Sequence, residues 1–208
     1  MSGDRRAYWD AVYQTKATQD ASWFQACPEM SLKLIHRAAI AKDAAIVDIG
    51  GGDATFADHL LSEGYSDVSV LDISEAALGR SRSRLGERSN GVAWIAGDVT
   101  DWRPQRRFDL WHDRAALHFL TAADEQAAYA QALHAALKCE GVAIIAGFAP
   151  GGPSQCSGLD IIQHDAESLS ALLGKGFALL ETHGEVHLTP AGREQRFRYH
   201  IFRRRSDL

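Results

Sequence analysis

Short apolar runs alternate with helical segments along this chain from residue 45 onward, and this alternation limits its fold more than any other feature. The runs are Ala45–Ile49, Val68–Leu71, Val92–Ala96, Phe108–Trp111 and Val142–Ala146. Between the first two, Phe56 and Leu60 stand four residues apart, which is the spacing of one helix face. Strands that are apolar throughout and separated by helices are typical of a parallel sheet covered on both faces. The alternation therefore predicts a doubly wound α/β fold.

The last part of the chain has a different pattern. A short helix is expected at Asp165–Leu173, where Gly174 ends it, and two strand-like segments follow at Phe177–Leu188 and Gln195–Arg203. No helix separates these two segments, so we expect them to pair antiparallel. Together with the earlier runs they predict a seven-stranded, mostly parallel sheet with a C-terminal antiparallel hairpin.

The length of 208 residues favours a single domain over residues 1–208, because a domain typically has ~150 residues. We divide it into an N-terminal helical cap (1–43), a core (44–148) and a C-terminal region that ends in the hairpin (149–208). The cap is rich in aromatic residues, among them Trp9 and Phe24. They either form a flap over the carboxyl ends of the strands or cover a sheet face.

Composition argues against several kinds of partner. The chain has 22 Lys and Arg against 27 Asp and Glu, a net charge of −5, whereas nucleic-acid binding needs clustered positive charge. No segment approaches the ~20 apolar residues of a membrane span, and the first residues do not resemble a secretory signal. Three scattered cysteines are typical of a reducing compartment. We expect a cytoplasmic monomer or homodimer that binds neither nucleic acid nor membrane.

Three glycines follow the first apolar run, in the order Asp48-Ile49-Gly50-Gly51-Gly52. Ligands of α/β sheets bind beyond the carboxyl ends of the strands, and glycine lets the backbone approach a ligand closely there. A dinucleotide fingerprint would need its third glycine at Thr55, and no Lys-Ser/Thr pair follows as in a Walker phosphate loop. The loop therefore argues against both of these phosphate-binding modes.

Two aspartates end the next two runs. Asp72 follows Gly50 by 22 residues, close to the ~20 at which an acid binds a ribose, and Ile73 can pack on an adenine ring. NAD and S-adenosylmethionine both contain adenosine, so Asp72 does not separate them. Asp98 can accept a hydrogen bond from an adenine amino group while the N–H of Val99 donates to the ring. Features at the ends of three successive strands favour a nucleoside site over helix caps or surface charges.

This Asp-containing loop after a third strand is typical of the class I S-adenosylmethionine-dependent methyltransferases, which the chain resembles from Ala45 to about Ala146. The resemblance implies a Rossmann-like fold in which residues 44–148 bind the cofactor and residues 149–208 lie on the substrate side. It implies that Gly50, Gly51 and Gly52 pass the aminoacyl part of S-adenosylmethionine and that Asp48 supports the loop or the amino group. Asp72 and Ile73 would contact the ribose and adenine, and Asp98 and Val99 would frame the adenine.

Two further segments resemble the thiopurine and thiol methyltransferases. One is Asp113–Leu117, and the other is the prefix that begins at Tyr8-Trp9 and continues at Trp23-Phe24-Gln25. In that group the N-terminal part closes over the cofactor. The resemblance therefore implies cofactor contacts for Trp9, Phe24 and Gln25, and for His112 and Arg114 after the fourth strand.

Catalytic candidates stand after the fourth apolar run, where methyl group and acceptor would meet. A thiolate acceptor needs little base, whereas a nitrogen or oxygen acceptor must lose a proton, which a histidine near neutral pKa can take. His112 and His118 are the candidates for this base, although His118 fits a wall position equally well, and Asp113 can orient either one. Asp160, His164 and Asp165 lack the spacing of metal ligands, so we expect no metal.

The first functional hypothesis is methyl transfer from S-adenosylmethionine to a small molecule, with a thiol or another heteroatom as acceptor. The alternative is a protein N-methyltransferase acting on lysine or an N-terminal amine, which the acidic balance would favour. The absence of an Asn/Asp-Pro-Pro-Tyr segment after the fourth strand counts against this alternative. The third hypothesis is a binding module that keeps the fold without catalysis.

Overall fold

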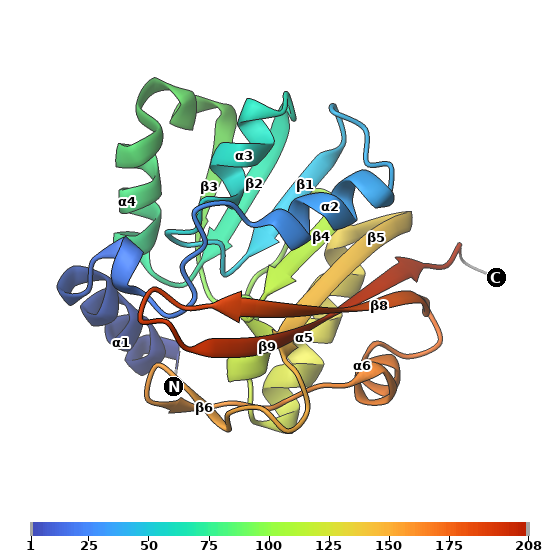
Figure 1. Cartoon of the computed structure of the whole chain (residues 1–208). Coiled ribbons are helices and arrows are strands. Elements are labelled where there is room, and N and C mark those ends of the chain that lie inside the picture. The colour runs from blue at the N-terminus through green and yellow to red at the C-terminus, as the bar shows by residue number, and fades with distance from the viewer. Residues whose placement is uncertain (1, 207–208) are drawn as a thin grey trace.

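The computed structural model describes residues 2–206 and confirms the predicted sheet (Figure 1). Seven strands lie side by side in the order β3 (Val92–Ala96), β2 (Asp67–Asp72), β1 (Ala45–Ile49), β4 (Phe108–Arg114), β5 (Leu137–Phe148), β9 (Glu194–Arg204) and β8 (Phe177–Leu188). The first five are parallel, while β9 runs antiparallel to both β5 and β8. The strand order reverses between β1 and β4, which is where ligands bind in open α/β sheets.

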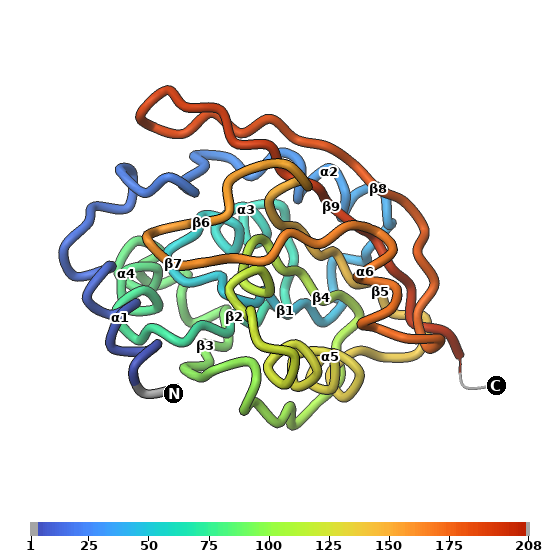
Figure 2. Tube along the Cα trace, turned by 90° about the horizontal axis from the view of Figure 1, so that it is seen from below, coloured from blue at the N-terminus to red at the C-terminus, as the bar shows by residue number. Residues whose placement is uncertain are grey.

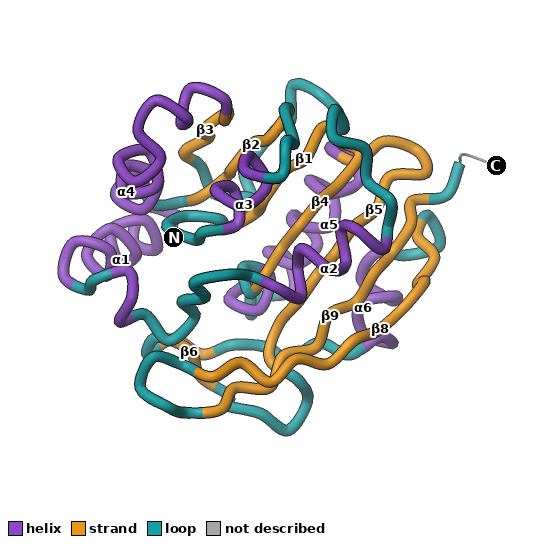
Figure 3. Tube along the Cα trace, turned by 45° about the horizontal axis from the view of Figure 1, so that its top comes forward, coloured by secondary structure: helices purple, strands orange, loops and turns teal. Residues whose placement is uncertain are grey.

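Helices cover both faces of the sheet, as the apolar strands require. On one face, α2 (Glu29–Arg37), α3 (Phe56–Ser62) and α4 (Glu75–Leu85) share a core with the side chains of Ile46, Val70 and Leu110. On the other face, α5 (Ala123–Ala136) and α6 (Ala166–Leu173) pack on Val47 and Trp111. Figure 3 shows the two helical layers with the strands between them.

Several segments gather at the edge where the parallel strands end. They are α1 (Ser2–Thr15), η1 (Thr18–Asp20), η3 (Leu117–Phe119) and a small hairpin of β6 (Gln155–Cys156) and β7 (Leu159–Asp160). The Tyr8 hydroxyl donates to the Ser157 carbonyl and so joins α1 to this hairpin. Figure 2 views the molecule from this side, with α1 and the hairpin near the ends of β1 and β2.

The fourth strand is longer than its apolar run indicates. We expected it to end near Trp111, but β4 continues through His112 and Asp113 to Arg114, paired with β1 and β5. The extra residues are polar, and their backbone groups are nevertheless bonded within the sheet.

Within residues 2–206, no helix is long and apolar enough to cross a membrane.

Candidate active site

A cavity lies at the carboxyl ends of the strands. Gly50 after β1, Asp72 at the end of β2 and Asp98 after β3 all line it. Ile73 and Val99 line the same part of the cavity, and Trp9 reaches it from α1. The three sequence features at successive strand ends therefore meet in one place, and we name this part of the cavity the nucleoside half.

The glycine loop has no room for side chains. A Cβ at Gly51 would lie 2.3 Å from Asp48 Oδ2, and one at Gly52 would lie 2.7 Å from Asp72 Oδ2. Gly50 and Gly52 also have positive φ angles, +66° and +34°, which L side chains rarely adopt. The loop thus needs glycine at each position, and its backbone lies close to the carboxylates of Asp48 and Asp72.

Asp72 is buried beneath the nucleoside half. Its Oδ1 accepts a hydrogen bond of 2.8 Å from the backbone N–H of Ser74, and Ser74 in turn caps α4 by accepting from the N–H of Ala77. Burial raises the pKa of the Asp72 carboxyl to about 7, and the nearby charges of Asp48 and Asp10 act in the same direction. A ligand that donates hydrogen bonds to this carboxylate would stabilise its ionised form and so offset part of the effect of burial.

Asp98 is held in place by its own loop and by the first helix. Its Oδ1 accepts from the Thr100 N–H at 3.0 Å and from the Thr100 hydroxyl at 2.7 Å. Its Oδ2 accepts from Arg5 of α1 at 3.2 Å, and Arg5 also pairs with Glu125 of α5. The Asp98 carboxylate is therefore fixed, and a residue that the sequence patterns did not indicate, Arg5, lies directly beside it.

A second cavity also borders the glycine loop. It is lined by seven of the residues implied as cofactor contacts: Phe24, Gln25, Asp48, Gly50, Gly51, His112 and Arg114. Five residues line both cavities and so mark the boundary between them: Tyr13, Trp23, Ile49, Gly50 and Arg114. Acids and cations both face the second cavity: Asp48, Asp53, Lys16 and Arg80. Such a mixture suits a zwitterionic group such as an amino acid.

His112 is enclosed by partners on both ring nitrogens. Nδ1 lies 2.7 Å from Asp48 Oδ1, and Nε2 lies 2.9 Å from the hydroxyl of Ser31. The ring also stacks at 4.1 Å on Phe56. Both nitrogens are occupied within the protein, so this arrangement holds Asp48 against the glycine loop and leaves no ring nitrogen free for an acceptor's proton.

Asp113 lies on the opposite face of β4 from His112, because successive side chains of a strand alternate. Its oxygens accept from the backbone N–H groups of Ala116 and Leu117 and from the Tyr129 hydroxyl, at 2.7 to 3.1 Å. It does not line either cavity. Burial raises the pKa of this carboxyl to about 6. Asp113 supports the turn after β4, which does not fit the catalytic role that its position in the sequence led us to expect.

His118 lies in η3, after β4, and lines the same cavity as Asp72 and Asp98. Its side chain is buried, and neither ring nitrogen has a hydrogen-bond partner among the described residues. Burial lowers its pKa to about 3, and the charge of Arg114 acts in the same direction. The ring is therefore neutral near pH 7 and is a weak base.

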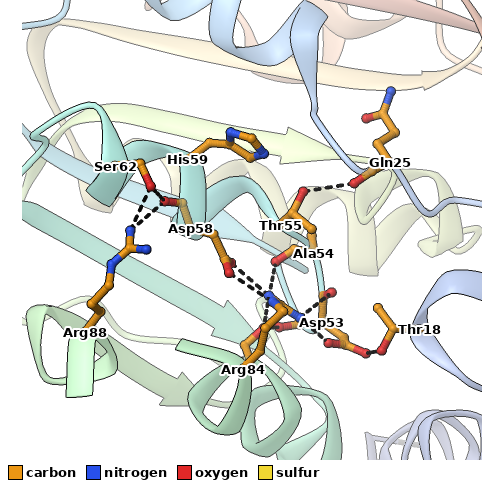
Figure 4. Close-up of polar contacts among 12 residues, drawn as sticks. Thr18, Gln25, Asp53, Ala54, Thr55, Asp58, His59, Ser62, Arg84 and Arg88 are labelled. Carbon is orange, nitrogen blue, oxygen red and sulfur yellow. Dashed lines mark hydrogen bonds and ion pairs between the residues drawn. The ribbon is translucent and has the colours of Figure 1, made fainter. Parts of the chain in front are cut away.

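The segment between α1 and α2 covers the second cavity, and polar contacts tie it to the glycine loop (Figure 4). The Thr18 hydroxyl donates to Asp53, which also accepts from Arg84 at 2.6 Å. The Thr55 hydroxyl donates to the Gln25 carbonyl at 2.9 Å. Phe24 and Gln25 thus sit in a flap over the strand ends, one of the two arrangements that we considered from the sequence.

The comparisons with known proteins agree with this geometry. Residues 46–141 match the family described as "Methyltransferase domain". Among curated proteins, the mouse eEF1A lysine and N-terminal methyltransferase is 24% identical over 120 residues, which are 57% of this chain and 17% of that protein. The chain therefore spans less than a fifth of the length of this relative.

Solved structures share the fold over nearly the whole chain. A SAM-dependent methyltransferase from Anabaena variabilis has a TM-score of 0.73 at 15% identity and covers 98% of this chain and 95% of its own. The Burkholderia thailandensis 1,6-didemethyltoxoflavin-N1-methyltransferase, solved with bound 1,6-didemethyltoxoflavin and S-adenosylhomocysteine, has a TM-score of 0.68 at 19% identity. The match covers 98% of this chain and 85% of that protein.

The [4+2]-cyclase SpnF has a TM-score of 0.75 at 15% identity and covers 100% of this chain and 97% of its own. A fold alone does not determine a reaction, and this neighbour is an example. The domain match is an additional observation that the fold comparison does not supply. Residues 46–141 of this chain match the methyltransferase domain family, within a fold shared with a SAM-dependent methyltransferase.

Proposed function

We propose that the chain transfers a methyl group from S-adenosylmethionine to a nucleophile on a small molecule. The observation that carries this proposal is that Gly50, Asp72 and Asp98 line one cavity at the ends of three neighbouring strands. Asp72 offers a carboxylate to the ribose hydroxyls and Asp98 offers one to the adenine amino group. Ile73 and Val99 provide apolar contact for the ring.

The remainder of the cofactor fits the second cavity. Its aminoacyl end carries an ammonium and a carboxylate, and the cavity presents Asp48 for the first and Lys16 for the second. When bound, S-adenosylmethionine supplies an electrophilic methyl on its sulfonium. The protein then aligns this methyl with the acceptor and excludes water, for which Trp9 and Trp23 at the cavity wall are suited.

The acceptor that this site favours is a thiol or another heteroatom that reacts without a strong base. Both nitrogens of His112 are occupied, Asp113 faces away, and the low pKa of His118 makes it a poor proton acceptor. A thiol ionises readily near neutral pH, and an aromatic nitrogen can react through its lone pair. The resemblance to thiol methyltransferases supports the same class of acceptor.

Titration calorimetry with S-adenosylmethionine tests the proposal directly. We expect the wild-type protein to bind and Asp72→Ala to weaken binding roughly 10- to 100-fold, because hydrogen bonds to a charged group are lost. Asp101→Ala is the matched control, since Asp101 is an exposed acid in the neighbouring loop, and we expect it to bind as the wild type does. Absence of binding by the wild type would reject the proposal.

A second candidate is a protein N-methyltransferase, which the eEF1A lysine methyltransferase relative and the net charge of −5 favour. Methyl-labelled S-adenosylmethionine added to a cell lysate with the protein separates the two candidates. We expect label in the small-molecule fraction. Label confined to the protein fraction would favour the second candidate.

A further inference from the structure

The first cavity is wider than a nucleoside site needs. Beyond the nucleoside half, its lining continues past β1 to the ends of β4, β5 and β9. We name this part the acceptor half; its residues are Arg114, His118, Phe119, Phe148, Cys156 and Phe197. Neighbouring strands are ~4.8 Å apart. The lining therefore spans ~24 Å of the sheet, from β3 to β9, and extends beyond the residues of the nucleoside half.

His118 is the unexplained group in the acceptor half. Only 2% of its surface is exposed, yet neither of its ring nitrogens has a partner among the described residues. Phe119 and Phe148 contact the ring edge-on, at 4.3 and 5.4 Å between centroids. Buried polar atoms are nearly always hydrogen-bonded, so an unpaired ring that lines a cavity indicates a partner supplied by a ligand.

Arg114 presents a second unpaired donor to the same cavity. Its Nε donates to the Tyr199 hydroxyl at 3.1 Å, its Nη1 donates to the Trp23 carbonyl at 3.2 Å, and its guanidinium lies 4.3 Å from the centre of the Phe197 ring. Nη2 has no hydrogen-bond partner among the described residues, although it forms a long ion pair with Glu185 Oε2 at 3.8 Å. The guanidinium is thus fixed in orientation with one nitrogen left for a ligand.

Charge distinguishes the acceptor half from the rest of the cavity. The acids that line the first cavity, Asp72 and Asp98, both belong to the nucleoside half. Glu185 does not line the cavity; it accepts from Gln25 and from Tyr199. A protonated amine in the acceptor half would therefore meet the guanidinium of Arg114, with no carboxylate among the described residues that line this half.

We propose that the acceptor half selects small planar molecules, neutral or anionic, that hydrogen-bond to His118 and Arg114, and that it disfavours protonated amines. The neutral imidazole offers one donor and one acceptor, and Arg114 offers a donor. Phe119, Phe148 and Phe197 supply flat apolar walls. The inference rests on the proposed function, because it takes the nucleoside half as the cofactor's place, and it makes His118 a specificity-determining residue.

The test uses protein saturated with S-adenosylhomocysteine and three probes of similar size: benzamide, benzoate and benzylamine. Their dissociation constants are measured by ligand-detected NMR titration. We expect benzamide and benzoate to bind at least tenfold more tightly than benzylamine. His118→Phe keeps the ring but removes both nitrogens, and it should weaken benzamide about fivefold to tenfold, the effect of one or two neutral hydrogen bonds. His118→Gln, which retains a donor and an acceptor, should restore part of the affinity.

His36→Phe is the matched control, because His36 lies exposed on α2 outside both cavities, and it should leave probe binding as in the wild type. Binding of S-adenosylhomocysteine is measured first. Its absence would overturn the proposed function and this inference together. If it binds and benzylamine is held as tightly as benzamide, or if neither His118 variant changes benzamide binding, the selection is wrong while the proposed function stands.

Discussion

The carboxyl group of Asp72 sits at the end of β2 with 6% of the residue exposed, and burial is the main cause that raises its pKa to about 7. The backbone N–H of Ser74 stabilises the ionised form, but the neighbouring carboxylates Asp48 and Asp10 oppose it. At neutral pH the free site therefore holds a mixture of protonated and ionised Asp72. A ribose that donates two hydroxyl hydrogen bonds binds the ionised form better.

We therefore expect the affinity for S-adenosylmethionine to rise with pH through about 7 and to level off above about pH 8. Below pH 7 each unit should weaken binding up to about tenfold, because the carboxyl must first lose its proton. Calorimetric titrations between pH 5.5 and 8.5 measure this. Asp72→Asn keeps the shape of the side chain without its ionisation, so its weaker binding should not vary over the same range. An equal pH slope in both proteins would contradict the assignment.

At the scale of single elements, local patterns predicted the strands and the residues at their ends. Gly50, Asp72 and Asp98 were correctly expected to converge, because parallel strands end at the same edge of a sheet. The length of β4 could not be predicted in the same way. Its last residues are polar, so no apolar run marks them, and pairing with β1 and β5 alone makes them part of the strand.

Because the length of β4 could not be predicted, the positions of the residues after the fourth apolar run could not be predicted either. In a loop, His112 and Asp113 could face one site together, but in a strand they must face opposite sides of the sheet. Arg5 and Tyr13 line the first cavity only because α1 docks on the strand ends. No spacing in the sequence specifies that docking, and a charged residue within a helix usually indicates an exposed face. Their role became visible only through contacts with distant residues.

Asp10 of α1 contacts the N-terminal end of α4, and we expect these contacts to help hold α1 in place. Asp10 Oδ1 accepts from the Ser74 hydroxyl at 2.6 Å and from the N–H of Ala76 at 3.2 Å. Asp10→Ala should therefore loosen α1 by roughly 1–2 kcal/mol, because hydrogen bonds to a charged acceptor and its interaction with the helix N-terminus are lost. Hydrogen exchange of the α1 amides should then accelerate about 5- to 30-fold.

Gln14→Ala is the control for that prediction, since Gln14 is an exposed, uncharged residue on the same helix. Its exchange should stay as in the wild type. Unchanged exchange in Asp10→Ala would mean that the apolar contacts of Trp9 and Tyr13 with Ala77 hold α1 without help from Asp10.

At the scale of the whole molecule, the folded chain keeps several histidines neutral in its interior. Burial lowers the pKa of His118, His164, His187 and His200. Above pH 6.5 these groups are neutral in the folded and the unfolded chain alike, so they do not affect stability. As the pH falls below 6.5 the unfolded chain binds protons that the folded chain does not, and the free energy of unfolding decreases.

Two aspartates act in the opposite direction over part of that range. The raised pKa values of Asp72 and Asp113, about 7 and about 6, mean that the folded chain binds their protons before the unfolded chain does. Their protonation therefore adds stability as the pH falls from about 7 towards about 4. The pH dependence of the wild type combines both groups of residues, so a comparison that removes one histidine isolates its share.

His118→Phe provides that comparison, because its ring position is apolar on two sides and phenylalanine does not titrate. With a folded pKa of about 3 against about 6.5 unfolded, His118 should cost the wild type about 2 kcal/mol at pH 5 and almost nothing at pH 8. The variant should therefore gain about 2 kcal/mol relative to the wild type between pH 8 and pH 5. Urea unfolding at the two pH values measures this gain, and pH 8 serves as the internal reference for the effect of the altered packing alone. A stability difference that is the same at both pH values would show that His118 binds its proton equally well in the folded and the unfolded chain.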